Sequence, residues 1–296
     1  MAPSPPPIFE RSLQRRRLAR AVKAGDTDFL LAWTVEEFRE RLTTVKRRFL
    51  TIADVGTPLP QLAQTLSAGD KEAFVVRLAP ITATLGDRPV LGLIGDEETL
   101  PFKPESFDLI VSALALQNVN DLPGTLIQIR RSLRPDGLFL GAILGGRSLD
   151  ELRSALAIAE AEITGGISPR VAPFADVRDM GSLLQRAGFA LPVTDIEPLT
   201  VRYANLFGLA ADLRAMGATN ALAERLRRPT PRRLFLRAAE IYAERHGDPD
   251  GRIRATFEVI FLSSWAPHDS QQKPLTPGSA QMRLADALKT MNIEPE

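Results

Sequence analysis

The chain has 296 residues, of which 44% are hydrophobic and 25% charged, so it is long enough to bury a core as one large domain or a domain with extensions. Its 37 lysines and arginines against 36 aspartates and glutamates leave a formal net charge of +1, which excludes an overall basic field for nucleic acid. The absence of cysteine excludes disulfides, a thiol nucleophile and cysteine-ligated zinc or iron–sulfur sites. Its apolar runs are strand-sized, well below the roughly 18 residues of a membrane span.

The first segment, residues 1–48, predicts a basic helical arm. The proline-rich and then arginine-rich composition is also compatible with an organelle transit peptide. Glu10 and the early prolines argue against that peptide and favour a helix that packs on the domain. One side of the helix is apolar and is expected to pack on the domain; it consists of Ile8, Leu13, Leu18 and Val22. The basic residues of the arm, Arg11 and Arg15 to Arg17, are expected to be solvated.

A doubly wound, mostly parallel α/β sheet is predicted for the chain that follows. Thr34, with Glu37 three residues later, has the pattern of an N-cap for a helix that runs to Phe49. Beyond it, apolar strand-like runs alternate with helical patterns, as in a sheet with helices on both faces. The expected strands cover residues 50–55, 74–78, 90–94, 107–113, 138–144, 193–203 and 255–265. The expected helices cover residues 59–66, 122–133, 149–163, 175–187 and 207–245, the last one broken at Gly217 and at Pro229 to Pro231.

These elements predict three parts of the chain. The basic arm is followed by an α/β domain over residues 49–270, with helical insertions at 147–190 and 205–246, and by a polar tail over residues 271–296.

The end of the first expected strand is a candidate binding turn. In an open parallel sheet, ligands bind at the carboxyl ends of the strands where the winding reverses. A cofactor-binding turn there supplies several glycines and free amides. This strand ends in Asp54, Gly56 and Thr57, and Pro58 and Pro60 follow without an amide hydrogen.

The next three strand ends differ in what they offer a nucleoside ligand. The second strand ends at Arg77 to Pro80 and lacks the acid that accepts hydrogen bonds from a ribose diol. The third ends in Asp96 and Glu97, and a carboxylate there is suited to an adenine amino group; the alternative for Asp96 is a turn or helix cap. After the fourth strand, Gln117 and Asn118 are expected to face the crevice.

Histidine chemistry is confined to two residues. His246 lies in a turn-like stretch and is interpreted as a surface residue, whereas for His268 a surface and a crevice position both stay open. No ligand spacing for a metal is present, so no metal site is predicted.

The segment from Asp96 to Gly137 resembles the class I S-adenosylmethionine-dependent methyltransferases, and in particular their type 11 group. The resemblance is carried by four motifs, at Leu100 to Phe102, Ser106 to Ser112, Asn120 to Pro123 and Leu133 to Gly137.

Almost the whole chain is more closely similar to the family of methyltransferase-like assembly factors of respiratory complex I and their bacterial relatives. The segments that carry this similarity are Ile8 to Arg11, Gly141 to Leu156, Gly165 to Pro169, Pro173 with Phe174, Leu184, Arg186 to Phe189, Met216 with Gly217, Asp250 with Gly251 after Tyr242, Trp265, His268 to Gln271 and Gly278 to Ala280.

The resemblance implies a seven-stranded sheet with its last strand antiparallel, and S-adenosylmethionine held by the turn after the first strand and by Asp96. The candidate cofactor-binding residues are Asp54, Gly56, Thr57, Asp96, Glu97 and Gln117. The chain departs from the family at the glycine-poor turn, at the missing second-strand acid and at Gln117, where relatives often carry histidine. Each lost charge-assisted contact costs about 1.5–3 kcal/mol, so we expect weakened or lost cofactor binding.

Three functions remain open from the sequence. The chain is predicted to be an S-adenosylmethionine-dependent methyltransferase-family protein that modifies a protein or small acceptor and is related to respiratory complex I assembly. The alternatives are a non-catalytic scaffold for a respiratory-chain subunit and a protein arginine hydroxylase, as the family resemblance implies for eukaryotic members. No catalytic side chain is assigned, because methyl transfer in this fold depends largely on positioning. Since the resemblance already begins at Ile8, we expect a cytoplasmic bacterial protein, or a matrix protein if the source is mitochondrial.

Overall fold

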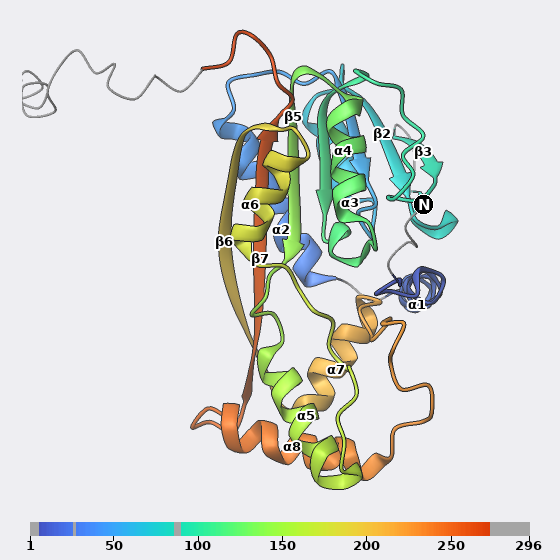
Figure 1. Cartoon of the computed structure of the whole chain (residues 1–296), viewed down its shortest axis with the longest axis vertical. Helices are drawn as coiled ribbons and strands as arrows, with labels where there is room; N and C mark the ends of the chain where they lie inside the picture. Colours follow the sequence, from blue (N-terminus) through green and yellow to red (C-terminus); the bar gives the residue numbers. More distant parts are fainter. Residues whose placement is uncertain (1–5, 26–27, 86–89, 273–296) are drawn as a thin grey trace, which may run out of the picture.

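The computed structural model describes residues 6–25, 28–85 and 90–272, and in these ranges the chain forms an α/β sheet above a helical region (Figure 1). The strands are β1 (Thr51–Val55), β2 (Phe74–Ala79), β3 (Leu91–Ile94), β4 (Phe107–Ala113), β5 (Leu133–Leu144), β6 (Ala190–Tyr203) and β7 (Ile253–Trp265). The helices are α1 (Arg11–Ala24), α2 (Phe29–Thr44), α3 (Gln61–Gly69), α4 (Leu122–Ser132), α5 (Asp150–Thr164), α6 (Val177–Arg186), α7 (Leu206–Ala215) and α8 (Arg232–His246). Two short 3₁₀ turns, η1 (Thr82–Thr84) and η2 (Leu116–Asn118), complete the pattern.

The sheet has the order β3-β2-β1-β4-β5-β7-β6, with β7 antiparallel to both of its neighbours. The expected doubly wound sheet with an antiparallel last strand is therefore confirmed. The winding reverses between β1 and β4, which pair in parallel. Their carboxyl ends flank the crevice in which this class of fold binds ligands.

Successive side chains of each central strand point to opposite faces of the sheet, and both faces are apolar. Helices therefore cover both faces. Ile52 packs in the cluster that contains α2 and α3, whereas the next residue, Ala53, packs in the cluster that contains α4 and α6. This two-sided burial explains the continuous apolar runs of the central strands.

The N-cap of α2 lies six residues earlier than predicted. Asp28 is its N-cap and accepts a hydrogen bond from the amide of Leu31 at 3.0 Å. Thr34 lies inside the helix, where its hydroxyl donates to the carbonyl oxygen of Leu30 at 2.8 Å. The predicted Thr34 cap is wrong because the side chain of Asp28 already satisfies the first free amides. The helix also ends at Thr44 rather than at Phe49.

Two further boundaries differ from the prediction. β5 starts at Leu133, where it already pairs with Phe107 across a register shift. The helical block expected over 207–245 is interrupted throughout residues 216–231, not only at its glycine and prolines. This irregular segment adjoins the N-terminal arm, as described below.

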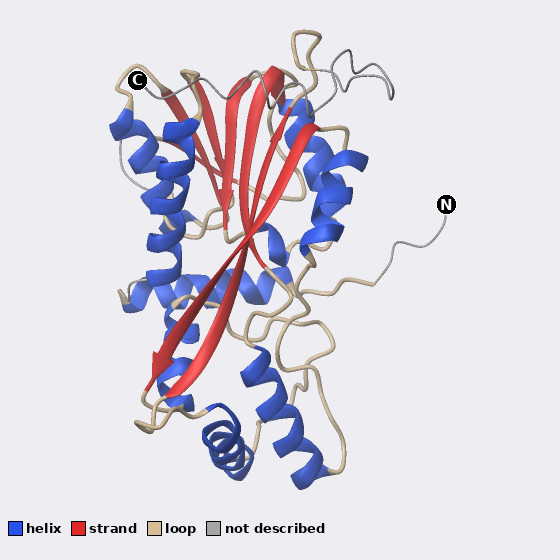
Figure 2. Ribbon diagram, turned by 90° about the vertical axis from the view of Figure 1, so that its left-hand side faces the viewer, coloured by secondary structure: helices blue, strands red, loops and turns tan. Residues whose placement is uncertain are grey.

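A long ribbon of β6 and β7 connects the sheet to the helical region. The two strands pair from Ala190 and Trp265 to Tyr203 and Ile253, whereas β5 pairs only with residues 259–265 of β7. The far half of the ribbon therefore projects beyond the sheet toward α5 and α8 (Figure 2). None of the helices in the described ranges is long and apolar enough to cross a membrane.

The expected division into arm, domain and tail stays a prediction. Residues 273–296, which include most of the expected tail and the family-like Gly278 to Ala280, lie outside the described residues.

Candidate functional site

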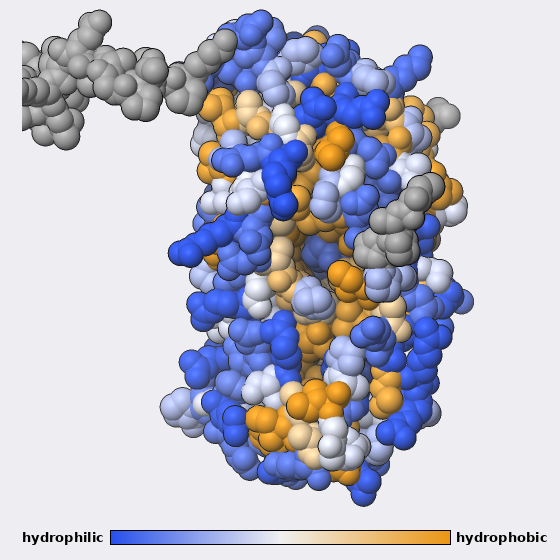
Figure 3. All heavy atoms as spheres, in the orientation of Figure 1, coloured by the Kyte–Doolittle hydropathy of each residue, from blue (hydrophilic) through white to orange (hydrophobic). Residues whose placement is uncertain are grey.

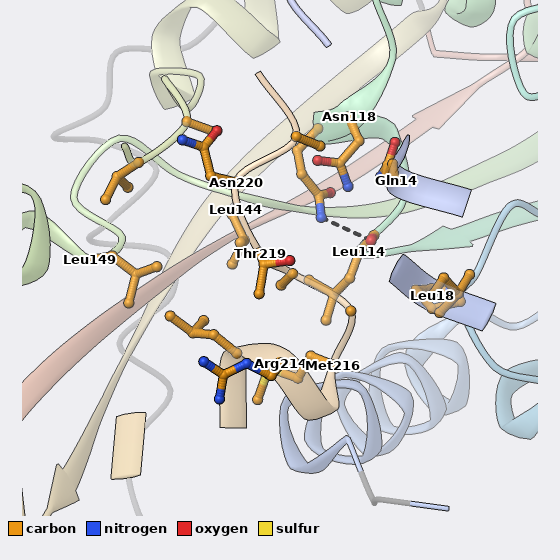
Figure 4. A pocket seen from close by; sticks show the side chains of 18 of the residues that line it. Gln14, Leu18, Leu114, Asn118, Leu144, Leu149, Arg214, Met216, Thr219 and Asn220 are labelled. Atoms are coloured by element: carbon orange, nitrogen blue, oxygen red, sulfur yellow. Dashed lines mark hydrogen bonds between the residues drawn. The ribbon is translucent and has the colours of Figure 1, made fainter. Parts of the chain in front are cut away.

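A cavity of about 350 Å³ lies between the carboxyl ends of the strands and the helical region. Gly56, Glu97, Leu114 and Gln117 line it at the strand ends. The opposite walls are largely apolar, and they also carry Arg170 and Arg214. Their apolar residues include Leu149, Leu152, Leu156, Leu206, Leu213 and Phe257. The space-filling view shows apolar surface inside the hollow on this face (Figure 3). In the close view, Gln14 and Leu18 of α1 stand on the side opposite Leu149 (Figure 4).

The helix α1 closes the strand-end side of the cavity with two arginines. Arg11 Nη2 donates to Asp96 Oδ1 at 2.8 Å and to Glu97 Oε2, and Arg11 Nη1 donates to the carbonyl oxygen of Asn118 at 3.1 Å. Arg15 Nη2 donates to Asp96 Oδ2 at 2.7 Å. The prediction that Arg11 and Arg15 are solvated is wrong, because the carboxylates after β3 draw both guanidinium groups onto the crevice.

The arm is also tied to the loop before α4 and to the irregular segment before α8. Phe9 N donates to Asn120 Oδ1 at 2.8 Å, and Glu10 N donates to the carbonyl oxygen of Ala221 at 2.8 Å. Arg17 donates to the carbonyl oxygen of Asn220, so it too is not simply solvated. Arg225 forms an ion pair with Glu10 at 2.8 Å. The arm thus bridges the sheet and the helical region.

The turn after β1 is built on a single glycine in the left-handed region. Gly56 has φ +72°, and its amide donates to the carbonyl oxygen of Leu78 at 2.9 Å. A Cβ at this position would overlap Cγ of Glu97. Glu97, whose residue is only 5% exposed, therefore lies directly over the turn.

Asp54 lies beneath this turn and is not exposed to the cavity. Asp54 and Arg77 are neighbours in the β1–β2 register, and both are completely buried and ion-paired. Arg77 also donates to the carbonyl oxygens of Thr57 at 2.5 Å and Thr84 at 2.8 Å. Burial raises the pKa of the Asp54 carboxyl, against the opposing effect of the Arg77 guanidinium and of Thr57. The pair is therefore a structural support for the turn.

Asp96 caps the turn after β3, which is one of the two roles that the sequence left open, and its use for a ligand stays a prediction. Its Oδ1 accepts a hydrogen bond from the amide of Glu98 at 3.0 Å, as a turn cap does. Burial opposes its ionisation, but the Glu98 amide and the guanidinium groups of Arg11 and Arg15 outweigh burial and lower the pKa of the carboxyl. Asp96 is therefore an anion held at the edge of the crevice.

Gln117 brings one unsatisfied acceptor to the cavity. Its Nε2 donates to the carbonyl oxygen of Leu114 at 2.8 Å, the bond drawn as a dashed line in Figure 4. Its Oε1 is buried and accepts no hydrogen bond within the described part of the chain. Leu114 itself has φ +52°, a backbone conformation that costs free energy for a branched residue and is often found at functional sites. The sequence predicted Gln117 at the crevice but gave no sign of the strain at Leu114.

His268 does not face the crevice. Its side chain is exposed, its Nδ1 lies 2.6 Å from the hydroxyl oxygen of Ser270, and it is not among the residues that line the cavity. Within residues 6–25, 28–85 and 90–272, no group of three or more histidine, aspartate or glutamate side chains is arranged to hold a metal ion.

The arrangement of donors and acceptors does not fit S-adenosylmethionine in this state. A nucleoside and an amino-acid end need free carboxylate oxygens and free amides at the strand ends. Both oxygens of Asp96 already accept hydrogen bonds, and Asp54 is paired inside the sheet. Pro58 and Pro80, which also line the cavity, offer no amide hydrogen.

Sequence comparison finds relatives that are similar to almost the whole chain. The zebrafish (Danio rerio) protein named arginine-hydroxylase NDUFAF5, mitochondrial, is 37% identical over 98% of this chain and 92% of its own length. The human (Homo sapiens) protein of the same name is 36% identical over 97% of this chain and 85% of its length. A malonyl-[acyl-carrier protein] O-methyltransferase from Xylella fastidiosa is 34% identical over 88% of this chain and 89% of its length.

A family of sequences described as a methyltransferase domain matches residues 63–141. Among solved structures, the YcgJ protein of Bacillus subtilis superposes with a TM-score of 0.54 at 13% identity, covering 82% of this chain and all of its own. A candidate methyltransferase from Bacillus halodurans superposes with a TM-score of 0.53 at 16% identity, covering 77% and 97%. At these identities the two structures show a shared fold only.

Proposed function

Since this chain belongs to the class I S-adenosylmethionine-dependent methyltransferase family, close to the NDUFAF5 arginine hydroxylases, we propose that it hydroxylates an arginine side chain of a protein. The balanced reaction takes dioxygen and two electrons from an external reductant, inserts one oxygen atom into a C–H bond of the arginine and releases the other as water. The observation that carries the proposal is the 37% identity to an arginine hydroxylase over 98% of the chain, which includes the helical segments lining the cavity as well as the sheet. Following the resemblance of the arm and the helical segments to complex I assembly factors, we take the protein substrate to be a respiratory-chain subunit.

The cavity has the chemistry that an arginine side chain requires. Its apolar walls suit the methylene stem of arginine, and its strand-end side carries acceptors for guanidinium N–H groups. Gln117 Oε1 is such an acceptor, because its own Nε2 is already bonded to Leu114. The carboxylates of Asp96 and Glu97 already hold a guanidinium, that of Arg11. These residues would bind and orient the substrate, and we assign no catalytic side chain.

The direct test is mass analysis of respiratory complex I subunits from a strain that lacks this chain. We expect one arginine to lose a modification of one oxygen atom in the deletion strain and to regain it on complementation. Complementation with Gln117→Ala should restore it incompletely, whereas Arg39→Ala, at a surface ion pair on α2, should restore it fully. An identical hydroxylation state with and without the chain would exclude this function.

Methyl transfer to a protein or small acceptor is the second candidate, favoured by the matched methyltransferase domain and by the malonyl-[acyl-carrier protein] relatives. We propose that S-adenosylmethionine affinity is weakened, since the turn and the second strand lack contacts worth about 1.5–3 kcal/mol each. Calorimetry with S-adenosylmethionine and S-adenosylhomocysteine tests this candidate. Binding on the order of micromolar that Asp96→Ala weakens would support it, and the absence of heat and thermal shift would exclude cofactor use.

A non-catalytic scaffold is the third candidate, favoured by the paired state of Asp54, Asp96 and Glu97. In this case the deletion strain would lose assembled complex I without any change in arginine modification or methylation. We place the protein in the bacterial cytoplasm, or in the mitochondrial matrix if its source is eukaryotic; fluorescence of a tagged chain would test this location.

A further inference from the structure

We propose that α1 is a gate of the crevice, closed by a plug that consists of Arg11 and Glu97 over the Gly56 turn, and that a nucleoside ligand such as S-adenosylhomocysteine binds only after Arg11 and Arg15 release the carboxylates. The inference rests on the proposed function only for the location of the crevice. It accounts for the occupied oxygens of Asp96 and for the covered Gly56 turn, whereas the pairing of Asp54 and the two prolines in the cavity lining do not depend on α1.

The Glu97 side chain occupies the position directly above the Gly56 turn. Gly56 keeps a positive φ and leaves an open position above the turn, and the Glu97 side chain fills that position. This is the strand-end turn at which the fold class brings ligands close to the backbone. The turn is therefore covered by a side chain of the same molecule.

Arg11 and Arg15 hold the Glu97 carboxylate over the turn. The residue is 5% exposed, and its carboxylate contacts Arg11 and, at 4.0 Å, Arg15. A buried carboxylate needs such partners, because its desolvation is otherwise uncompensated. Without the two arginines, Glu97 is expected to turn toward solvent and uncover Gly56.

The same two arginines bind Asp96, the acceptor that a nucleoside would use. Arg15 donates a hydrogen bond to Oδ2 of Asp96 at 2.7 Å. Arg11 and the amide of Glu98 both donate to Oδ1 of Asp96. Release of both arginines frees Oδ2 while the Glu98 amide still fixes the orientation of the carboxyl. The same movement therefore opens the turn and supplies an acceptor.

The helix α1 buries few apolar side chains. Of the 14 residues of α1, only Ala21 is buried, whereas the 16 residues of α2 include five buried ones. The α1 contacts with the crevice are ionic and partly exposed, and such contacts are weakened by salt and by competing charges. The bonds of Phe9 and Glu10 to Asn120 and Ala221 keep the arm tethered when the ionic contacts break.

The test measures the affinity of the full chain for S-adenosylhomocysteine by calorimetry. We expect the double variant Arg11→Ala with Arg15→Ala to bind at least about tenfold more tightly than the natural sequence. The matched control is Arg16→Ala with Arg20→Ala, which removes the same charge from exposed positions of the same helix and should bind as the natural sequence does. Adding Asp96→Ala to the first double variant should abolish the gain.

An equal or weaker affinity of the Arg11 and Arg15 double variant, including no binding to either chain, would overturn the gate. If that variant unfolds, Arg11→Gln with Arg15→Gln keeps hydrogen-bonding side chains and provides the same comparison. Hydrogen exchange gives an independent readout: ligand at saturating concentration should speed exchange in α1, and unchanged exchange in the bound natural sequence would also overturn the gate. A lack of arginine hydroxylation in cells would contradict the proposed function and leave these binding results unaffected.

Discussion

Two groups of ion pairs lie next to the Gly56 turn, and they differ in how deeply they are buried. Arg77 and Asp54 lie inside the sheet, with both side chains completely buried. Arg11 and Arg15 meet Asp96 and Glu97 at the rim, with arginine side chains that are 14% and 33% exposed. The inner pair cannot separate without opening the sheet, whereas the rim contacts can exchange with water and ligands. Burial thus decides which pair is structural and which can serve as a gate.

The largest expected effect is at the inner pair. Arg77→Met leaves Asp54 as an unpaired buried carboxyl and should lower the free energy of unfolding by about 3–5 kcal/mol, measured by urea denaturation. Adding Asp54→Leu to the same chain should recover most of the loss, because no charge then remains buried. A loss below about 1 kcal/mol for the single variant would show that the inner pair is no more structural than the rim.

The helical region has a pair of intermediate burial, Glu160 with Arg170, whose side chains are 4% and 13% exposed. Hydrogen bonds from Arg170 and Ser168 lower the pKa of Glu160 to about 2. Because the folded pKa is below the unfolded one, the stabilisation is complete above about pH 4.5 and disappears as the pH falls toward about 2.

Glu160→Gln should therefore lower the free energy of unfolding by about 1.5–3 kcal/mol at neutral pH and by much less near pH 2. Denaturation curves of both chains across this range measure the difference. A gap that does not shrink in acid would mean that the ionised form of Glu160 is not what stabilises the loop.

The Gly56 turn can be separated from its cover by two alanine substitutions. Gly56→Ala should cost about 1–2 kcal/mol more than Gly25→Ala, since both glycines have a positive φ but only Gly56 faces a side chain, that of Glu97. Thermal unfolding measures both variants. Equal losses would show that Glu97 moves away at little cost, and the Gly56→Ala loss should shrink when Glu97 is also changed to alanine.

The smallest stability effect is expected at the rim. Arg11→Ala should lower the free energy of unfolding by less than about 1 kcal/mol at low ionic strength, and the difference should vanish in about 1 M salt. Urea denaturation at two salt concentrations measures it. A large loss of unfolding free energy that does not depend on salt would mean that the rim contacts are structural, like the Asp54–Arg77 pair. It would argue against a movable helix.

Local patterns were enough to predict the sheet and the crevice. The strand ends at Gly56, Glu97 and Gln117 lie together at the cavity, because the carboxyl ends of parallel strands share one edge. The use of these residues and of Asp54, Thr57 and Asp96 for a cofactor stays a prediction. Local periodicity contains no information about partners far apart in sequence, so it could not pair Arg11 with Asp96.

The inner pair did leave a signal in the sequence. Asp54 and Arg77 are each the fourth residue of neighbouring apolar strands, and two opposite charges at the same level of a parallel pair indicate a buried ion pair. The correct cap of α2 was also visible, since Asp28 directly precedes the apolar run that begins at Phe29. The ion pair becomes visible only when two neighbouring strands are compared, whereas the Asp28 cap is visible in the sequence of its own helix.

The ribbon of β6 and β7 has a mechanical consequence. Its upper half is clamped by β5, whereas the half that includes Thr200 and Thr256 has no third strand and extends toward α5 and α8. One pair of strands therefore connects the sheet to the helical region, so a displacement of α5 and α8 relative to the sheet would bend or twist the unsupported half of the ribbon.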